Sequence, residues 1–568
     1  MDNVAQDYYR KNSHLLMKGM WYSELPDILE IDDLCLSVES ILLKIDQHSL
    51  AIYEQDGDGF IQGWKGINSP KGVRSPGVEA LSFFEFKKNK SLREMQIPNL
   101  VHYLSFIYNS LHVFSPLFEK LYIDSANAPV VAHSNSYLVF ENEFVADVSY
   151  EGDAEYRLQG LFATRNNKTN TSAMFSENRV RQMNEERAYL YSMKVDIESF
   201  FPSLYTHYFE RMAKKEPYKS LISDSRYFSF LDRYHQRIND NQTKGVPAGV
   251  FSSHVGAELL MLCVDQEIEE YIQSRKAGIG YIRYVDDLTF YSDDEAELKL
   301  MFSKVQSILN AYRLRINGNK TESIHSVMSV QPSYIREIER LFPFLADSDQ
   351  AHELEMNEFL EIRKYIGNCL ESSRTSQIKT LLSRIRRFIE ENKLDIGEID
   401  YLMFCYLLRL AFEEPLLCIH IFCLLNVLLA VSESKAQMIN ELLAKQQIID
   451  SQYADTVFQI WFYYTLFQHA DTKTKRMLLK GLNGKDYNPL VVATMILPGK
   501  KANETLYKYI RDSYIRISGS SEWKKEIMYS KWWLPLFKII RYDSHNYDSF
   551  LHSENIPVVF RLFPVHET

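Results

Sequence analysis

The stretch "YIRYVDDLTFYSDD" at residues 281–294 places two adjacent carboxylates, Asp286 and Asp287, between two short runs of β-favouring residues. Branched and aromatic residues of this kind on both sides of a polar pair predict two strands joined by a tight turn. The next segment, "SDDEAELKLMFSKVQSILNAY", has apolar residues at helical spacing, with Ser292 or Asp293 available as its N-cap. The sequence therefore predicts strand, turn, strand and helix.

The adjacent carboxylates have two interpretations. Asp is a favoured turn residue, so a lone "VDD" is most often a solvated turn. A second acid points to another role, because Asp196 ends the short apolar strand expected in "YSMKVDIESFFPSLYTH" (191–207), although an N-capping Asp looks similar in sequence. If Asp196 meets Asp286 and Asp287, three carboxylates can hold two Mg²⁺ ions, and metal binding would relieve the repulsion within the pair.

Length and composition restrict the class of protein. A chain of 568 residues is too long for one ordinary core, so two or three domains are expected. The net charge of −11 argues against a protein that merely coats nucleic acid, but the charge is uneven, at −7 over residues 251–300 and +5 over 451–568. An acidic centre suits cation binding and a basic end could hold phosphates, although solvated surface explains either as well.

The sequence also indicates the compartment. The N-terminus lacks the apolar core of a signal peptide, and the most apolar stretch, residues 416–431, is short for a membrane span. We expect a cytoplasmic protein with a buried helix at that stretch and no membrane contact. No CxxC pair occurs, which indicates buried free thiols in a reducing compartment. The six cysteines are Cys35, Cys263, Cys369, Cys405, Cys418 and Cys423.

The pattern of apolar residues changes along the chain. Helical patterns ("LEIDDLCLSVESILLKI", "IPNLVHYLSFIYNSL") precede a strand-like stretch at about 129–165, and a helix-rich section with short strands continues to about 330. Beyond it the pattern is almost wholly helical, as in "EFLEIRKYIGNCL" and "TVFQIWFYYTLF". This predicts an α+β region followed by an all-α helical-repeat, HEAT-like domain. A compact bundle is the alternative.

Four segments in order along the chain together resemble the palm of reverse transcriptases. They are "VDIESFFPS" from Val195, with an aromatic residue five positions after Asp196, "TKGVPAGVFSSHVGAELLML" (243–262), "YVDD" and "YRLRINGNKTESI" (312–324). The resemblance implies reverse transcriptase fingers and palm, with a helical extension and the start of the fingers at 1–125, the fingers and palm at 126–330, and the helical-repeat domain at 331–568.

The resemblance also implies roles for individual residues. Asp196, Asp286 and Asp287 would be catalytic and ligate two Mg²⁺ ions, or Mn²⁺, with the carbonyl of Ile197 as a further ligand. Phe201 falls at the position that excludes a 2′-hydroxyl, so deoxynucleotides would be preferred, although a core Phe is an equal reading of that residue alone. The remaining nucleotide-binding candidates are Gly245, Pro247 and Gly249 in a bare loop that template and nucleotide can approach, Lys320 near the triphosphate, and Arg179 and Arg181, with Arg165, from the fingers. Lys244 departs from the family, in which many members have Gln.

The palm followed by a long helical domain is similar to the abortive-infection reverse transcriptases of bacteria, the AbiK-like defence group. That resemblance implies antiphage defence, homo-oligomers (trimers or hexamers), and DNA synthesis without a conventional template, in some members primed by a protein hydroxyl. The implied partners are deoxynucleoside triphosphates, a single-stranded DNA product, and an RNA template or noncoding RNA. Two alternatives stay open: a catalytically inactive palm scaffold whose helical domain binds nucleic acid or protein, and another palm-type enzyme such as an RNA polymerase or a nucleotide cyclase.

Overall fold

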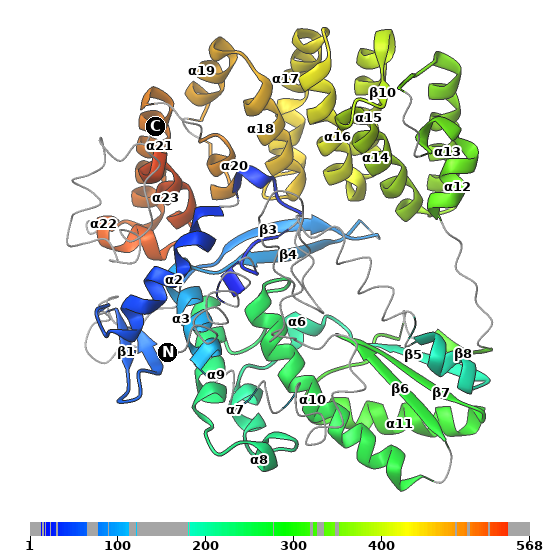
Figure 1. Ribbon diagram of the computed structural model, residues 1–568. Helices are drawn as coiled ribbons and strands as arrows, with labels where there is room; N and C mark the ends of the chain where they lie inside the picture. Colours follow the sequence, from blue (N-terminus) through cyan, green and yellow to red (C-terminus); the bar gives the residue numbers. More distant parts are fainter. Residues whose placement is uncertain are drawn as a thin grey trace.

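The computed structural model describes residues 13–121, 180–346 and 351–542, apart from short gaps. The gaps are residues 14–15, 18, 23, 30–31, 51, 65–77, 89, 113–116, 118–120, 181, 276–277, 319–321, 327–333, 483–484, 497–499 and 521–522. In the described part, a small antiparallel sheet with its helices lies on one side of an arc of helices formed by the second half of the chain (Figure 1).

The sheet that carries the candidate site has four strands in the order β6-β7-β5-β8, with every neighbouring pair antiparallel. The strands are β5 (Tyr191–Asp196), β6 (Ile279–Tyr284), β7 (Asp287–Ser292) and β8 (Glu322–Ser326). Strands β6 and β7 form the predicted hairpin, and the cross-strand pair Tyr281 and Phe290 stacks with ring centroids 4.8 Å apart. Burial of this pair fixes the register, since a one-residue slip would turn both rings away from the core.

The predicted helix after the hairpin is confirmed as α11 (Glu295–Ala311), which packs on β5 and β7. Its N-cap differs from the prediction. The side chain of Asp294 caps the helix by accepting the Ala296 N–H at 2.8 Å. Asp293 instead accepts the N–H of Leu190 at 2.9 Å, just before β5, and the Ser292 hydroxyl accepts the N–H of Asp294. The N-cap prediction was wrong because the side chain of Asp293 accepts a hydrogen bond from Leu190, a residue distant in sequence, and Asp294 caps the helix instead.

Helices fill the chain between β5 and β6. The longest is α10, of 24 residues, which begins directly after the "GVPAG" loop and buries most of its first half. The helices of this section are α6 (Phe200–Ser203), α7 (His207–Met212), α8 (Tyr218–Leu221), α9 (Arg226–Ile238) and α10 (Phe251–Ser274).

The first part of the chain contains the two predicted helices and two hairpins that the sequence did not suggest. The elements are η1 (Asp27–Leu29), α2 (Asp32–Asp46), β1 (Tyr53–Gln55), β2 (Ile61–Trp64), β3 (Leu81–Phe86), β4 (Leu92–Ile97) and α3 (Leu100–His112). The hairpin of β3 and β4 was missed because the first three residues of β4 are all exposed and the strand lacks a strict alternation of buried and exposed residues. The strands expected at about 129–165 lie outside the described residues.

Among the described residues between 334 and 542 the chain is almost entirely helical, as predicted. Its helices are α12 (Tyr334–Leu341), η4 (Pro343–Leu345), α13 (Met356–Glu371), α14 (Thr375–Glu390), η5 (Gly397–Ile399), α15 (Asp400–Glu413), η6 (Pro415–Leu417), α16 (Cys418–Val431), α17 (Lys435–Gln452), α18 (Val457–His469), α19 (Thr472–Lys480), α20 (Pro489–Thr494), α21 (Lys500–Ser518), α22 (Trp523–Glu526), η7 (Ile527–Tyr529) and α23 (Trp533–Tyr542). A short parallel pair joins β9 (His352–Glu353) to β10 (Leu394–Asp395).

These helices form two layers. One layer stacks α14, α16, α18, α20 and α23 in succession, and helices such as α15 and α17 cover them. The apolar stretch at 416–431 is the largely buried α16 with its preceding turn. Over the part of the chain that the structure describes, no helix is both long and apolar enough to cross a bilayer. A repeat of HEAT type stays a prediction.

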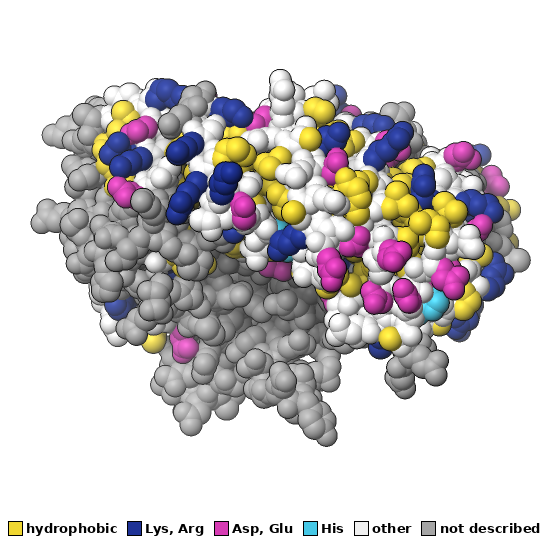
Figure 2. All heavy atoms as spheres, turned by 90° about the horizontal axis from the view of Figure 1, so that it is seen from above, with side chains coloured by type: hydrophobic (Ala, Val, Ile, Leu, Met, Phe, Trp, Pro, Cys, Tyr) yellow, Lys and Arg dark blue, Asp and Glu magenta, His cyan; other side chains and the backbone are white. Residues whose placement is uncertain are grey.

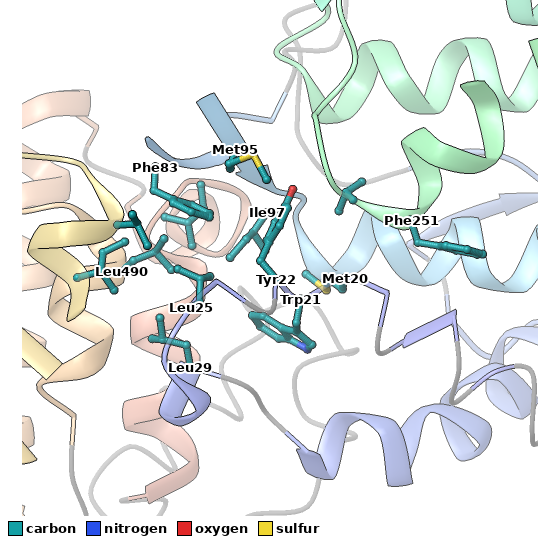
Figure 3. Packing of buried hydrophobic residues seen from close by; sticks show 14 of the residues in the cluster. Met20, Trp21, Tyr22, Leu25, Leu29, Phe83, Met95, Ile97, Phe251 and Leu490 are labelled. Carbon is teal, nitrogen blue, oxygen red and sulfur yellow. The ribbon is translucent and has the colours of Figure 1, made fainter. Parts of the chain in front are cut away.

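The N-terminal segment packs against both the section that carries the sheet and the helical region from residue 334. Tyr22, Phe83 and Leu490 belong to one buried cluster, which continues toward Phe251 at the start of α10 (Figure 3). Polar contacts reinforce the junction, because the backbone N–H of Phe84 donates to the carbonyl of Asp455 at 2.8 Å. The predicted domain limits at residues 125 and 330 stay predictions, since both fall outside the described residues.

Candidate active site

The fold brings the three predicted acids to one edge of the sheet. Strands β5 and β7 pair so that Asp196 lies directly opposite Asp287. Beyond that pair, the backbone N–H of Ile197 donates to the carbonyl of Asp286 at 3.3 Å. Antiparallel pairing sets directly opposite residues about 4.5–5.5 Å apart. Asp196 and Asp287, which are 91 positions apart in the sequence, are therefore neighbours across a strand pair.

The turn that carries the acid pair has a strained backbone. Tyr284 pairs with Asp287, so Val285 and Asp286 form a two-residue loop between β6 and β7. Val285 has φ of +55°, a conformation that a β-branched side chain rarely adopts. Such strain costs about 1–3 kcal/mol and persists only where the surroundings hold it. The turn is thus fixed by its neighbours and not by the preference of its own sequence.

Asn317 holds Asp196 from the other side. Its side-chain Nδ2 donates to Oδ2 of Asp196 at 2.9 Å, and its backbone N–H donates to the carbonyl of Asp196 at 2.8 Å. Ile316 forms an isolated antiparallel bridge with Ile197, which aligns the two segments. The sequence interpretation missed this residue. Its signal was an amide in the turn "RINGN", within a segment already singled out for Lys320.

The donor set suits a hard divalent cation. Asp196 and Asp286 are half-buried and Asp287 is exposed, so all three carboxylates reach the solvent edge of the sheet. Oxygen ligands of this kind fit Mg²⁺ or Mn²⁺. In the described ranges, no three His, Cys, Asp or Glu side chains are gathered tightly enough to hold an ion. The backbone places the three acids at one edge of the sheet, but their carboxylates are not drawn together around a single point.

Phe201 lies beside the "GVPAG" loop. Its carbonyl accepts the N–H of Val246 at 3.0 Å. Its half-buried ring packs edge-on against His254, with the two ring centroids 4.8 Å apart. Burial lowers the pKa of His254 to about 4, so the imidazole facing Phe201 is neutral at pH 7. The contact joins the motif that follows Asp196 to the helix that follows the loop.

The glycines of the loop allow close approach of protein atoms. Gly245 has φ of +87°, and a Cβ there would lie 3.4 Å from the carbonyl oxygen of Pro202. Gly249 has φ of +84°, and its Cβ would lie 2.4 Å from Cε1 of Tyr22. The hydroxyl of Tyr22 also lies 2.6 Å from the carbonyl oxygen of Ala248. Contact of this loop with template or nucleotide, and with the buried Pro247 in particular, stays a prediction.

The remaining candidates can be placed only in part. Arg165, Arg179, Arg181 and Lys320 lie outside the described residues. Lys244, which stands where many reverse transcriptases have Gln, is exposed beside the loop. Its backbone forms an isolated bridge with Tyr205.

A buried ion cluster under the turn was missed in the sequence. Arg283 of β6 is 0% exposed and contacts two acids of α10, Glu258 and Asp265. The nearest distances from its Nη atoms are 2.8 Å to Glu258 and 2.7 Å to Asp265. The sequence offered one signal for this cluster. Glu258 and Asp265 are seven positions apart in the apolar run "AELLMLCVD", a spacing that places both acids on the same face of a helix. Buried carboxylates at that spacing require a buried cation.

Comparisons with known proteins agree with the motifs. Residues 155–359 match the model of the family described as "Reverse transcriptase (RNA-dependent DNA polymerase)". The chain is also 30% identical over 140 residues to the retron Ec83 reverse transcriptase of Escherichia coli. That alignment covers 23% of this chain and 42% of the retron enzyme, so the chain spans less than half of that relative's length.

Solved structures with detectable similarity include telomerases from two Candida species. Telomerase from Candida albicans, in complex with a telomeric RNA fragment, aligns with 74% of this chain and 68% of its own, at 10% identity and a TM-score of 0.26. Apo telomerase from Candida tropicalis aligns with 83% of this chain and 70% of its own, at 11% identity and a TM-score of 0.32. The match to the family model alone shows that residues 155–359 are similar to reverse transcriptases, and this region contains Asp196, Asp286 and Asp287.

Proposed function

We propose that this protein is an RNA-directed DNA polymerase-like nucleotidyltransferase with Asp196, Asp286 and Asp287 as its catalytic acids. The pairing of Asp196 opposite Asp287 carries the proposal, because it joins two motifs far apart in the sequence at one solvent-facing sheet edge. The match of the surrounding residues to the reverse transcriptase family supports it. A solvated turn would not need a partner acid on a neighbouring strand.

The three carboxylates, with the carbonyl of Ile197, are the groups that would hold two Mg²⁺ or Mn²⁺ ions. When bound, such ions lower the pKa of an attacking hydroxyl and neutralise charge on a leaving pyrophosphate. The chain's own contribution is to position the ligands. Asn317 orients Asp196 through its side chain and its backbone, and strand pairing fixes Asp287 opposite it.

Selection of deoxynucleotides is proposed to depend on Phe201. Its carbonyl is tied to Val246, and its ring is restrained by His254. A ring held in place on the nucleotide side would collide with a 2′-hydroxyl, whereas a mobile ring could move aside. The nucleotide-binding roles of Gly245, Pro247, Gly249, Lys320, Arg179 and Arg181 belong to the same proposal.

In the cell, we propose antiphage defence by abortive infection, in the manner of the AbiK-like group, with untemplated or protein-primed DNA synthesis, in a cytoplasmic homo-oligomer. The long helical region after the reverse transcriptase-like region and the partial similarity to a retron enzyme support this role. The helical region is proposed to guide the DNA product or seat a neighbouring subunit. Lys and Arg side chains are scattered over the face of the molecule seen from above (Figure 2).

Incorporation of labelled nucleotides by the purified chain tests the proposal. The reactions contain Mg²⁺ and a primed RNA template, a primed DNA template or no nucleic acid, with either the four deoxynucleotides or the four ribonucleotides. We expect DNA synthesis that requires the divalent ion and prefers deoxynucleotides. Synthesis without added nucleic acid would favour the untemplated or protein-primed mode. No incorporation under any of these conditions would support the inactive-scaffold alternative.

A further inference from the structure

The buried arginine under the active-site turn uses all its donor nitrogens. Nε of Arg283 donates to Asp265 at 3.0 Å, and Nη2 donates to both Asp265, at 2.7 Å, and Glu258, at 3.1 Å. Nη1 donates to Glu258 at 2.8 Å and to the backbone carbonyl of Val285 at 3.2 Å. A guanidinium has five N–H donors in a rigid planar fork. Here the fork spans two helix carboxylates and one turn carbonyl.

The acids are themselves anchored in a rigid element. Glu258 and Asp265 lie on the long helix α10 and are 2% and 0% exposed. Asp265 also accepts the hydroxyl of Tyr281 at 2.6 Å. Removing one partner of such a buried cluster is strongly unfavourable, because the other charge is left unpaired in a medium of low polarity. The guanidinium therefore has one geometry relative to α10.

The backbone carbonyl to which Arg283 donates belongs to Val285, the residue with the strained backbone. Val285 has φ of +55° and directly precedes Asp286. Because β-branched residues avoid this region of backbone space, the turn left to itself would relax. A hydrogen bond from a charged donor to the Val285 carbonyl opposes that relaxation, and charge-assisted bonds of this kind are about twice as strong as neutral ones.

We propose that Arg283, clamped by Glu258 and Asp265, is a positioning residue that locks the Val285 turn so that Asp286 and Asp287 face Asp196. The proposal rests on the proposed function, since it concerns the same acids. Arg283 does not touch the reacting atoms. It acts through the backbone of the turn, and it ties the carboxylate edge of the sheet to helix α10, which follows the "GVPAG" loop.

The Arg283→Lys variant tests this role. Lysine keeps the charge, but its single ammonium cannot reproduce the planar fork to two carboxylates and the turn carbonyl. The matched control is Tyr281→Phe, which removes one donor to Asp265 within the same cluster and leaves the contact between Arg283 and Val285 in place. Both variants should lower the Tm.

The distinguishing measurement is the Mg²⁺ dependence of DNA synthesis by the folded protein. We expect Arg283→Lys to raise the half-saturating Mg²⁺ concentration at least fivefold and to lower kcat at least tenfold, while the deoxynucleotide KM at saturating Mg²⁺ changes less than threefold. Tyr281→Phe should keep its half-saturating concentration within twofold of the wild type. If Arg283→Lys lowers the Tm but retains the wild-type metal dependence, Arg283 is merely structural and the proposal is overturned.

A second substitution tests the strain in the turn and, by relieving that strain, should also stabilise Arg283→Lys. Glycine at 285 adopts positive φ without strain, so Val285→Gly should make the turn less dependent on Arg283. We expect Arg283→Lys/Val285→Gly to recover at least threefold of the lost kcat, and no recovery would count against the strained-turn mechanism. A wild-type protein without any metal-dependent synthesis would instead refute the proposed function itself, which separates the two failures.

Discussion

Asp196 and Asp287 face each other across the β5–β7 pair at the end of the sheet, although 90 positions separate Asp196 from Asp286, the other acid of the turn. In the two-metal site that we propose, this register makes the acidic turn one half of the site. The other half comes from a strand held by Asn317. The turn also contains Val285, which has a positive φ, and the buried Arg283 donates a hydrogen bond to the carbonyl of Val285.

Replacement of Phe201 by Val should weaken discrimination against ribonucleotides. The smaller side chain removes ring volume beside His254 and leaves space for a 2′-hydroxyl. We expect the ratio of kcat/KM for a deoxynucleotide to that for the matching ribonucleotide to fall at least tenfold at matched folded fraction, because loss of the half-buried ring also lowers the Tm. An unaltered ratio would show that Phe201 is only a core residue. Single-nucleotide incorporation kinetics measure this directly.

The Gly249→Ala substitution should destabilise the protein. The added Cβ would lie 2.4 Å from the ring of Tyr22 and 2.7 Å from Cε of Met95, at a φ of +84°. Backbone strain alone should lower the free energy of unfolding by roughly 1–3 kcal/mol. Gly57→Ala is the control, since nothing lies within 4 Å of the Cβ that alanine would add there, and we expect a change within about 0.5 kcal/mol. Denaturant unfolding measures the free energy of unfolding of both variants. Equal losses in Gly249→Ala and Gly57→Ala would contradict the close packing of Tyr22 and Met95 against Gly249.

Exposed basic residues of α19 should contribute to DNA affinity if the helical region guides the product. Lys473, Arg476 and Lys480 are exposed on that helix. Charge reversal of all three should reduce the slope of log Kd against log salt for single-stranded DNA by about 2, since each phosphate contact contributes about 0.7. Reversal of the exposed Lys364 and Arg409 serves as the control. An unchanged slope in the α19 variant would remove this helix from the proposed path.

The buried His235 should make stability depend on acid pH. Burial lowers its pKa to about 4 in the folded state, against about 6.5 in an unfolded chain. Protonation therefore favours unfolding, and the free energy of unfolding should fall by roughly 3 kcal/mol as the pH drops from about 6.5 to 4. A His235→Asn variant should show a flatter Tm profile over that window. Parallel profiles for the two proteins would contradict this assignment.

The sequence predicted the acidic residues of the candidate site better than it predicted the contacts that hold them in place. The β-favouring residues on both sides of "VDD" were sufficient to predict the hairpin. The helices α2, α3 and α11 were predicted from the spacing of their apolar residues. The encounter of Asp196 with Asp287 depends on long-range strand pairing, so only the resemblance of ordered motifs suggested it. The local sequence pattern did not identify Asp294 as the N-cap of α11. That choice depends on the hydrogen bond from the distant Leu190 to Asp293.

Other features were hidden for physical reasons. The alternation of β6 placed Arg283 in a strand without showing that its charge is buried, because burial depends on acids of another element. The contact of Gly249 with Tyr22, which lies in the distant N-terminal segment, could not be predicted from the loop sequence. Contacts between segments far apart in sequence leave no local periodicity to detect.

The most direct test of the central claim is deoxynucleotide incorporation by the single variants Asp196→Ala, Asp286→Ala and Asp287→Ala beside the wild type, at matched folded fraction. If the three acids form one site, each variant should lose at least a hundredfold in rate, and combined variants should be no worse than single ones, because residues that act as a unit are not additive. Wild-type polymerisation by Asp196→Ala, with loss only in the other two, would contradict the convergence of the acids.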